Sequence, residues 1–319
     1  MINNILVTGA AGFIGLHLSK SLLEDGFNVI GIDNLNNYYD VELKKARLKE
    51  IVNYKNFVFE EVDITNRSKL KQIFLKFKPI KVINLAAQPG VRYSIENPYA
   101  YLDSNLVGFL NIIELCRHNN VKGLIYASSS SVYGNNSKVP FSVEDRVDNP
   151  ISLYAATKKS NELIASTYSH LYGLNTTGLR FFTVYGSWGR PDMAYYIFTN
   201  RIIRNKTIDV FNNGKMKRDF TYIDDIISGL RSAIDKNYKC EIFNLGNSKS
   251  ENLMDFISLI EKELDIKAKI NFRSIQSGDM KETYAEITKS KNMLSYSPKT
   301  TLDIGIKKFI NWYKNYYQI

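Results

Sequence analysis

The sequence predicts an α/β fold of the Rossmann type, a doubly wound parallel sheet with helices packed on both of its faces. Short apolar runs alternate with segments of helical periodicity through roughly the first 180 residues. A glycine-rich turn joins the first apolar run to the helix that follows it, and polar clusters stand where several later strands should end. Strands that alternate with helices need crossover connections, which make the strands parallel and cover both faces of the sheet.

Size and composition are those of a soluble globular protein. The chain has 319 residues, of which 44% are hydrophobic and 23% charged. No apolar run is long enough for a membrane span, and the N-terminal region shows no secretory signal. Cys116, Cys240 and the three histidines lack the spacing of metal ligands or of a disulfide framework. We therefore expect no metal and a reduced, cytoplasmic setting.

The net charge of +10 comes from 42 Lys and Arg against 32 Asp and Glu. The lysines are scattered through the chain rather than gathered in a basic block. We therefore expect neither nucleic acid nor a membrane as a partner, while a phosphate-bearing small molecule is compatible with the charge.

The run TGAAGFIG at residues 8–15 follows the expected strand 4–7 and opens an apolar-periodic helix. Gly9 allows a tight turn, Gly12 lets a pyrophosphate approach the backbone, and Gly15 lets the helix pack closely on the strand. The helix then starts at Phe13 and Ile14 with its free amides facing the phosphates. This arrangement predicts a Rossmann-type dinucleotide site.

A second strand over residues 29–33 ends in Asp33, followed by Asn34. An acid at this place hydrogen-bonds ribose hydroxyls and repels a 2′-phosphate, so we expect NAD rather than NADP. Capping of the next turn is the alternative reading of this acid.

Later strands are expected over residues 56–62, 81–85, 123–127 and 175–182, with helices over 68–77, 99–117 and 153–172. Ligands of parallel sheets bind beyond the carboxyl ends of the strands. Further cofactor contacts are therefore expected at the residues that end these strands, which are Asp63, Ile64, Leu85, Ala86, Ala87, Gln88 and the serine run 128–131. In the helix 99–117, the apolar spacing includes Leu106, Leu110, Ile113 and Leu115.

Tyr154 and Lys158 lie four residues apart, on one face of the helix 153–172. A nearby ammonium favours the phenolate and lowers the pKa of a tyrosine, which can then take a proton from a hydroxyl. The spacing alone equally fits a half-buried tyrosine beside a solvated lysine. The dinucleotide site and the serine run upstream favour the chemical interpretation.

Four motifs together resemble the extended short-chain dehydrogenase/reductase family, the NAD-dependent epimerases and dehydratases of nucleotide sugars. They are TGAAGFIG, Asp33, SSSSVYG at 128–134 and YAATK at 154–158. GVRYS at 90–94, LRFFTVYGSWGRPDMA at 179–194 and RDFTYIDD at 218–225 closely resemble UDP-glucuronate 4-epimerases. Ser187 departs from this pattern, since relatives usually carry Pro there.

The resemblance implies that Ser129, Tyr154 and Lys158 are catalytic and that Asn105 supports the site. NAD would stay bound and be regenerated in each cycle, while UDP-glucuronate becomes UDP-galacturonate through a 4-keto sugar. Related dehydratases and decarboxylases carry acids directly after the Ser129 position, where this chain has Ser130 and Ser131. Without such an acid, epimerisation is favoured over loss of water and, less strongly, over loss of CO₂.

A uronic acid needs a cationic or hydroxyl-rich pocket for its carboxylate, and arginine forks match carboxylates well. Arg190 and Arg92 are candidates, although a loop arginine can equally be solvated or paired in a salt bridge. The full set of expected substrate contacts, most of them implied by the resemblance, is Arg92, Ser129, Ser130, Thr183, Arg190, Phe211, Arg218, Gln276 and Asp279.

The expected organisation is a Rossmann domain over residues 1–180, which carries NAD and the catalytic residues, and a smaller mixed α/β lobe for the nucleotide sugar over 181–319. The two parts interleave in relatives. Amphipathic helices are expected over 253–264 and 303–317. The resemblance also implies a homodimer through the helices 99–117 and 153–172.

Three other functions stay open from the sequence. The chain could epimerise UDP-glucose or UDP-N-acetylglucosamine, because a few residues can change the preference of a pocket. It could decarboxylate UDP-glucuronate. It could also be a regulatory protein that binds NAD without turnover. A part in polysaccharide biosynthesis is suggested only by the chemistry of the product.

Overall fold

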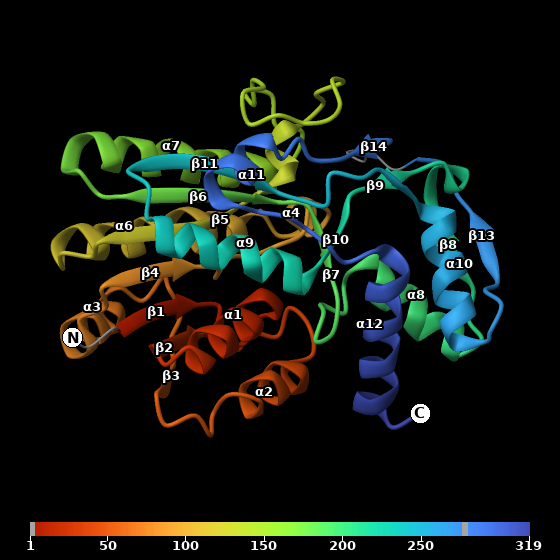
Figure 1. Ribbon diagram of the computed structural model, residues 1–319, viewed down its shortest axis with the longest axis horizontal. Helices are drawn as coiled ribbons and strands as arrows, with labels where there is room; N and C mark the ends of the chain where they lie inside the picture. The colour runs from red at the N-terminus through yellow and green to blue at the C-terminus, as the bar shows by residue number, and fades with distance from the viewer. Residues whose placement is uncertain (1–3, 276–279) are drawn as a thin grey trace.

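The computed structural model describes residues 4–275 and 280–319 and is built around a seven-stranded sheet (Figure 1). Its strands stand in the order β11–β6–β5–β4–β1–β2–β3, and all neighbours are parallel, which confirms the predicted fold class. The direction of winding reverses between β1 and β4, and ligands of such sheets bind at this point. The strands are β1 (Asn4–Thr8), β2 (Asn28–Asp33), β3 (Phe57–Glu61), β4 (Lys81–Asn84), β5 (Gly123–Ser129), β6 (Thr176–Phe181) and β11 (Cys240–Leu245).

The central strands are apolar on both faces because each face packs against helices. In β1, Ile5 and Val7 belong to one hydrophobic core, while Leu6 belongs to a second core on the opposite face. Successive side chains of a strand point to opposite faces, so a continuous apolar run is what a strand buried on both sides needs.

Two sets of helices form these cores. Helices α1 and α9 pack together on the face that is toward the viewer in Figure 1, and α11 packs on α9. Helix α6 packs between α3 and α7 on the other face. The helices are α1 (Phe13–Glu24), α2 (Val41–Lys49), α3 (Arg67–Phe77), α4 (Tyr93–Glu96), α5 (Pro98–Tyr101), α6 (Phe109–His118), α7 (Leu153–Tyr172), α8 (Ala194–Ile203), α9 (Ile223–Lys236), α10 (Leu253–Leu264), α11 (Thr288–Leu294) and α12 (Leu302–Tyr317).

The second half of the chain adds three small sheets beside the main one (Figure 1). They pair β7 with β10, β8 with β13, and β9 with both β12 and β14. Strand β11, although it belongs to the second half of the chain, pairs with β6 at the edge of the main sheet. The division into two domains at residue 180 stays a prediction. The strands are β7 (Thr183–Tyr185), β8 (Ile208–Val210), β9 (Lys217–Arg218), β10 (Phe220–Tyr222), β12 (Glu251–Asn252), β13 (Ile270–Phe272) and β14 (Glu282–Thr283).

Helix α12 supports the loop between β7 and α8. The ring of Trp188 in this loop lies 5.3 Å from the ring of Trp312 and 5.3 Å from the ring of Tyr316, both on α12. Aromatic contacts at these distances add to the free energy gained from burial. The loop is thus held from the C-terminal side by a cluster of large rings.

The expected long helix over 99–117 is interrupted by a π-helical segment, Leu102–Gly108. In α6, which follows the π segment, Leu110 is 43% exposed, whereas Ile112 and Ile113 are buried. The side chain of Asn161 donates to the carbonyl of Asn105 at 2.7 Å, and such insertions accompany π segments near functional sites.

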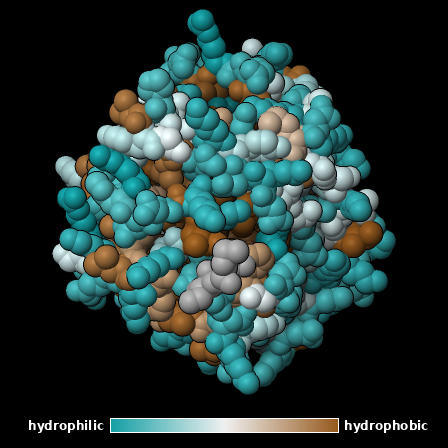
Figure 2. Space-filling model, turned by 60° about the vertical axis from the view of Figure 1, so that its left-hand side comes forward, coloured by the Kyte–Doolittle hydropathy of each residue, from teal (hydrophilic) through white to brown (hydrophobic). Residues whose placement is uncertain are grey.

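The face shown in Figure 2 is mainly hydrophilic, with hydrophobic side chains in small separate patches. Across the described parts of the chain, no helix is long and apolar enough to cross a membrane.

Candidate active site

Most of the predicted site residues line one cavity of about 470 Å³ at the carboxyl ends of the sheet strands. It begins at the glycine turn after β1 and reaches the start of α7 and the loop after β7. The predicted residues that line it are Gly9, Gly12, Phe13, Ile14, Gly15, Asp33, Asn34, Asp63, Ile64, Leu85, Ala86, Ala87, Gln88, Ser129, Ser130, Tyr154, Lys158, Thr183, Arg190 and Arg218.

The glycine turn has no room for side chains. Gly9 has a φ of +71°, and a Cβ on Gly15 would lie 2.0 Å from the carbonyl oxygen of Gly9. The amide of Gly12 donates to the same carbonyl at 2.9 Å. The turn therefore presents bare backbone at the start of α1, and this cradle fits the pyrophosphate of a dinucleotide.

Two carboxylates at strand ends flank this cradle. Asp33 accepts hydrogen bonds from the amides of Ala11 at 3.2 Å and Leu35 at 2.9 Å, and burial raises its pKa. Burial also raises the pKa of Asp63, but hydrogen bonds from Thr65 and Asn34 outweigh it and hold that pKa below its usual value. Both acids are thus fixed in place beside the position expected for a ribose.

Asn105 lies behind the cavity and holds two of its walls together. Its side chain accepts from the amide of Gln88 at 2.8 Å and donates to the carbonyl of Gln88 at 3.1 Å. It also donates to the hydroxyl of Thr157 on α7 at 3.1 Å. Asn105 therefore ties the end of β4 to the helix that carries Tyr154, as expected of a supporting residue.

Ser129, Tyr154 and Lys158 meet at the cavity wall. All three side chains line the cavity, and Ser129 Oγ lies 2.7 Å from Ser131 Oγ. Lys158 Nζ donates to the carbonyl of Ala127 at 2.9 Å and lies 6.0 Å from the centre of the Tyr154 ring. The structure thus brings together the three residues that the sequence singled out.

The pKa of Tyr154 differs from our expectation. Burial raises it above its ordinary value, while the hydrogen bond from Ser129 and the charge of Arg190 act in the opposite direction. Burial also lowers the pKa of Lys158 to about 8. Desolvation disfavours the charged form of both groups, so the lysine four residues away does not by itself produce a phenolate.

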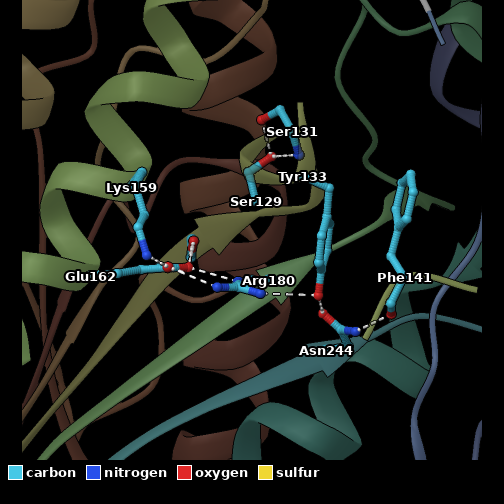
Figure 3. A network of polar contacts seen from close by, with 9 residues as sticks. Ser129, Ser131, Tyr133, Phe141, Lys159, Glu162, Arg180 and Asn244 are labelled. Carbon is cyan, nitrogen blue, oxygen red and sulfur yellow. Dashed lines mark hydrogen bonds and ion pairs between the residues drawn. The ribbon is translucent and has the colours of Figure 1, made fainter. Parts of the chain in front are cut away.

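A buried polar network lies directly behind Ser129 (Figure 3). Arg180 on β6 forms a two-point ion pair with Glu162 on α7, at 2.8 and 2.9 Å. Glu162 also accepts from the hydroxyl of Ser128, and Arg180 donates to that of Tyr133. The Tyr133 hydroxyl in turn donates to Asn244 on β11 at 2.7 Å. The network therefore joins the serine run, the Tyr154 helix and the last strand of the sheet.

On the substrate side, the structure pairs Arg190 with Asp192. The guanidinium donates from Nε and Nη2 to the two carboxylate oxygens at 3.0 and 2.6 Å. The hydroxyl of Tyr38 donates to the same carboxylate at 3.2 Å. The charge of Arg190 thus reaches the cavity while two of its donors are engaged by a neighbouring acid.

The remaining predicted substrate contacts are Arg92, Phe211, Arg218, Gln276 and Asp279. Arg92 stacks over the ring of Phe211 at 5.1 Å, and neither residue lines the cavity as far as the chain is described. Arg218 lines the cavity and donates to the carbonyl of Lys217 at 2.8 Å. Gln276 and Asp279 lie outside the described residues.

Helix α2 and its contribution to the site were not predicted from the sequence. The buried residues of α2 are Leu43, Lys44 and Arg47, so charged side chains face inward and no apolar period is visible. Tyr38, Tyr39 and Lys44 line the cavity, while Arg47 lies fully buried behind it. The N-cap signal of Asp40, which accepts from the amide of Glu42, could have revealed the helix but not its inward face.

In the described residues, no group of three or more His, Cys, Asp or Glu is placed to hold a metal ion.

A parallel sheet with a glycine turn at its switch point and a Ser/Tyr/Lys set in the same cavity defines a class, the dinucleotide-binding proteins of short-chain dehydrogenase type. A model of the NAD dependent epimerase/dehydratase family matches residues 5–246, and the chain belongs to this family.

Relatives match over nearly the whole chain. UDP-glucuronate 4-epimerase 2 of Arabidopsis thaliana is 47% identical, over 99% of this chain and 76% of its own length. Protein CapI of Staphylococcus aureus is 50% identical, over 98% of this chain and 99% of its own. The crystal structure of UDP-glucuronic acid 4-epimerase from Bacillus cereus, in complex with UDP-glucuronic acid and NAD, is 35% identical with a TM-score of 0.93, and the match covers 98% of this chain and 100% of that one.

Proposed function

We propose that the protein is an NAD-dependent 4-epimerase that converts UDP-glucuronate into UDP-galacturonate through a 4-keto sugar. One observation carries this proposal: Ser129, Tyr154 and Lys158 open onto the same cavity as the glycine turn. A sugar hydroxyl at Tyr154 can therefore lie beside a dinucleotide held at the turn. Proteins named as UDP-glucuronate 4-epimerases are similar to this chain over nearly its whole length, and they support the choice of substrate.

NAD would be held by the turn at Gly9–Gly15 and by the strand ends at Asp33, Asp63 and Ala86. When bound, it supplies an acceptor and donor of hydride for carbon 4 of the sugar. The acid at Asp33 favours NAD over its 2′-phosphorylated form.

Tyr154 exchanges the proton of the sugar 4-hydroxyl, and Ser129 orients that hydroxyl. The hydrogen bond from Ser129 and the positive charge of Arg190 both favour the phenolate of Tyr154 against the effect of burial. Lys158 is held by Ala127 one helical turn from Tyr154. Removal of the proton in one direction and its return in the other complete the cycle.

The carboxylate of the sugar is held by hydroxyls and by charge. Ser130 and Thr183 line the cavity and can donate to it directly, while Arg190, already paired with Asp192, supplies positive potential. A 4-keto uronic acid is a β-keto acid that loses CO₂ easily. We infer that a firmly held carboxylate, together with serines in place of acids at 130 and 131, suppresses this loss.

The uridine diphosphate end lies toward the second half of the chain. Arg218 lines the cavity there and is the proposed contact for the diphosphate. Phe211, stacked under Arg92, is the proposed neighbour of the base. Gln276 and Asp279 complete the proposed set of substrate contacts from the resemblance alone.

The same proposal includes a cytoplasmic homodimer that binds neither nucleic acid nor membranes. The helices expected at its interface expose apolar side chains: Leu110 is 43%, Leu163 57% and Leu171 59% exposed. A Leu163→Glu variant should shift the mass measured by light scattering toward the monomer. Ile304→Glu, at an exposed site on α12, serves as the control and should leave the mass unchanged. A wild-type protein that is already monomeric would contradict this part.

The test of the enzymatic proposal is to incubate the purified protein with UDP-glucuronate and identify the products by proton NMR. UDP-galacturonate formed without added NAD supports the epimerase and a retained cofactor. A UDP-pentose would show decarboxylation instead. No reaction with NAD supplied, followed by turnover of UDP-glucose or UDP-N-acetylglucosamine, would move the assignment to a neutral sugar.

A further inference from the structure

The loop at residues 186–192, which carries Arg190, is held by side chains from the N-terminal part of the sequence. Three successive carbonyls of this loop are engaged. Ser187 O lies 2.9 Å from Nε2 of His17 on α1. Arg47 on α2 donates from Nε to Trp188 O at 3.0 Å and from Nη2 to Gly189 O at 2.9 Å.

The same guanidinium also reaches the glycine turn. Arg47 Nη1 donates to the carbonyl of Ala11 at 3.1 Å and to the hydroxyl of Tyr39 at 2.6 Å. The amide of Ala11 in turn donates to Asp33. Arg47 is 0% exposed, so one buried side chain bridges the cofactor turn and the substrate loop.

The loop needs such support because its backbone is strained. Trp188 has a φ of +62°, a conformation that a bulky residue rarely adopts. A Cβ on Gly189 would lie 1.9 Å from the hydroxyl of Tyr195. Conformations of this kind persist only where surrounding contacts fix them. Here those contacts are the hydrogen bonds from Arg47 and the packing of the Trp188 ring against Trp312 on α12.

The loop matters for chemistry because it sets the position of Arg190. The charge of Arg190 lowers the pKa of Tyr154, opposing the effect of burial. A shift of the loop would therefore change both the electrostatics at Tyr154 and the wall against which the sugar lies.

We propose that Arg47, assisted by His17, is a positioning residue that keeps the Arg190 loop in register with the glycine turn. The inference rests on the proposed epimerase function. Occupation of the turn by a dinucleotide stabilises the Ala11 carbonyl on one side of the guanidinium and thereby the Trp188–Gly189 carbonyls on the other. The loop at residues 186–192, on the substrate side of the cavity, is therefore fixed in position only when the cofactor site is ordered.

The first test needs no turnover. Amide hydrogen exchange is measured across residues 9–15 and 186–192, with and without added NAD. In the wild type, NAD should slow exchange in both segments. In Arg47→Met, the slowing should persist at 9–15 and be lost at 186–192. Equal slowing of both segments in the variant would overturn the proposal.

The second test separates positioning from stability. Arg47→Lys keeps the charge but cannot reach four oxygens, so we expect the KM for UDP-glucuronate to rise about tenfold, with a smaller change in kcat, since misplacement of a binding wall is costly. The His17→Gln variant, which keeps a donor, should stay near the wild-type KM, and His17→Leu should show a smaller rise than Arg47→Lys. Arg231→Lys is the matched control, because Arg231 donates to Ser21 and Asp25 rather than to the loop.

The outcomes distinguish this inference from the proposed function. If the wild type fails to epimerise UDP-glucuronate, the function is wrong, and the exchange experiment still decides the coupling. If the wild type is active and Arg47→Lys has an unchanged KM, or one that moves no more than in Arg231→Lys, the positioning assignment is wrong.

Discussion

Arg180 and Arg47 are both buried, yet they have opposite partners. Arg180 is 2% exposed and faces the carboxylate of Glu162 with two donors. Arg47 is 0% exposed and donates to three carbonyls and one phenol, all neutral. The first arginine joins α7 to the sheet, and the second joins two loops across the cavity.

This difference in partners indicates what the positive charge of each arginine contributes. The charge of Arg180 is cancelled locally, so its contribution lies in the geometry of a closed network. The charge of Arg47 is not cancelled by direct contact, and it lowers the pKa of the buried Asp33 carboxyl, opposing the effect of burial there. We therefore expect loss of Arg180 to affect mainly folding, and loss of Arg47 to affect mainly the site.

The largest expected effect follows from breaking the pair of Arg180 and Glu162. Arg180→Met removes the two-point ion pair of the buried Glu162 carboxylate, which keeps only the Ser128 hydroxyl and Lys159 at 3.7 Å, and should reduce the free energy of unfolding by about 3–5 kcal/mol. Denaturant unfolding measures this change. The double variant Arg180→Met with Glu162→Leu should recover most of the loss, and a double variant as unstable as the single one would contradict the account.

Lys158 extends the comparison to a buried cation whose ammonium donates a hydrogen bond to one backbone carbonyl, that of Ala127. Burial lowers its pKa to about 8 in the folded protein, below the unfolded value near 10.5. The penalty on folding is therefore complete below pH 8 and fades as the pH rises toward 10.5. Lys158→Met should gain up to about 3 kcal/mol in free energy of unfolding over the wild type below pH 8, with the gain shrinking at higher pH.

A gain in Lys158→Met that does not change with pH would show that the folded lysine keeps its ordinary pKa. Thr157→Val, at the neighbouring buried position, is a control for packing changes in α7, and its effect should not depend on pH over this range.

Tyr154→Phe should lower turnover without the loss of stability expected for the variants of Arg180 and Arg47. Removal of the phenol takes away the proton acceptor, so turnover should fall by about 10²-fold or more. The stability should stay close to that of the wild type, because the ring still packs against Tyr101. Single-turnover kinetics and thermal unfolding measure the two effects, and near-normal turnover would remove Tyr154 from its proposed place.

A smaller loss of stability than for Arg180→Met is expected for Arg47→Met. The variant leaves neutral oxygens without donors, and we expect a loss of about 2 kcal/mol in the free energy of unfolding. Denaturant unfolding beside Arg180→Met tests this directly. An equal or larger loss for Arg47→Met would break the contrast between the two arginines.

Much of the fold could be predicted because local signals agreed with tertiary structure. Helix α7 runs from Leu153 to Tyr172 as expected, since Ser152 caps its start and Gly173 ends it with a φ of +67°. The site clusters could be predicted because the strand ends of a parallel sheet share one edge.

The rest depended on contacts between distant residues. The inward face of α2 is charged, so only the oxygens of the distant loop at Trp188 and Gly189 explain why Arg47 is buried. The carbonyl of Asn105, in the π-helical segment, accepts from Asn161, which lies more than fifty residues later in the chain. The direction of the pKa shift of Tyr154 depends on how deeply the folded chain encloses it. None of these features leaves a periodic trace in the sequence.

The packing of Trp188 against α12 has a consequence for biosynthesis. As the chain leaves the ribosome, strands β1 to β6 and the glycine turn emerge well before Trp312 and Tyr316. A nascent chain can therefore assemble the cofactor half early, while the strained turn at Trp188 still lacks its aromatic support. Translation itself thus sets an order, in which the nucleotide cradle matures first and the sugar wall closes only after α12 has been made.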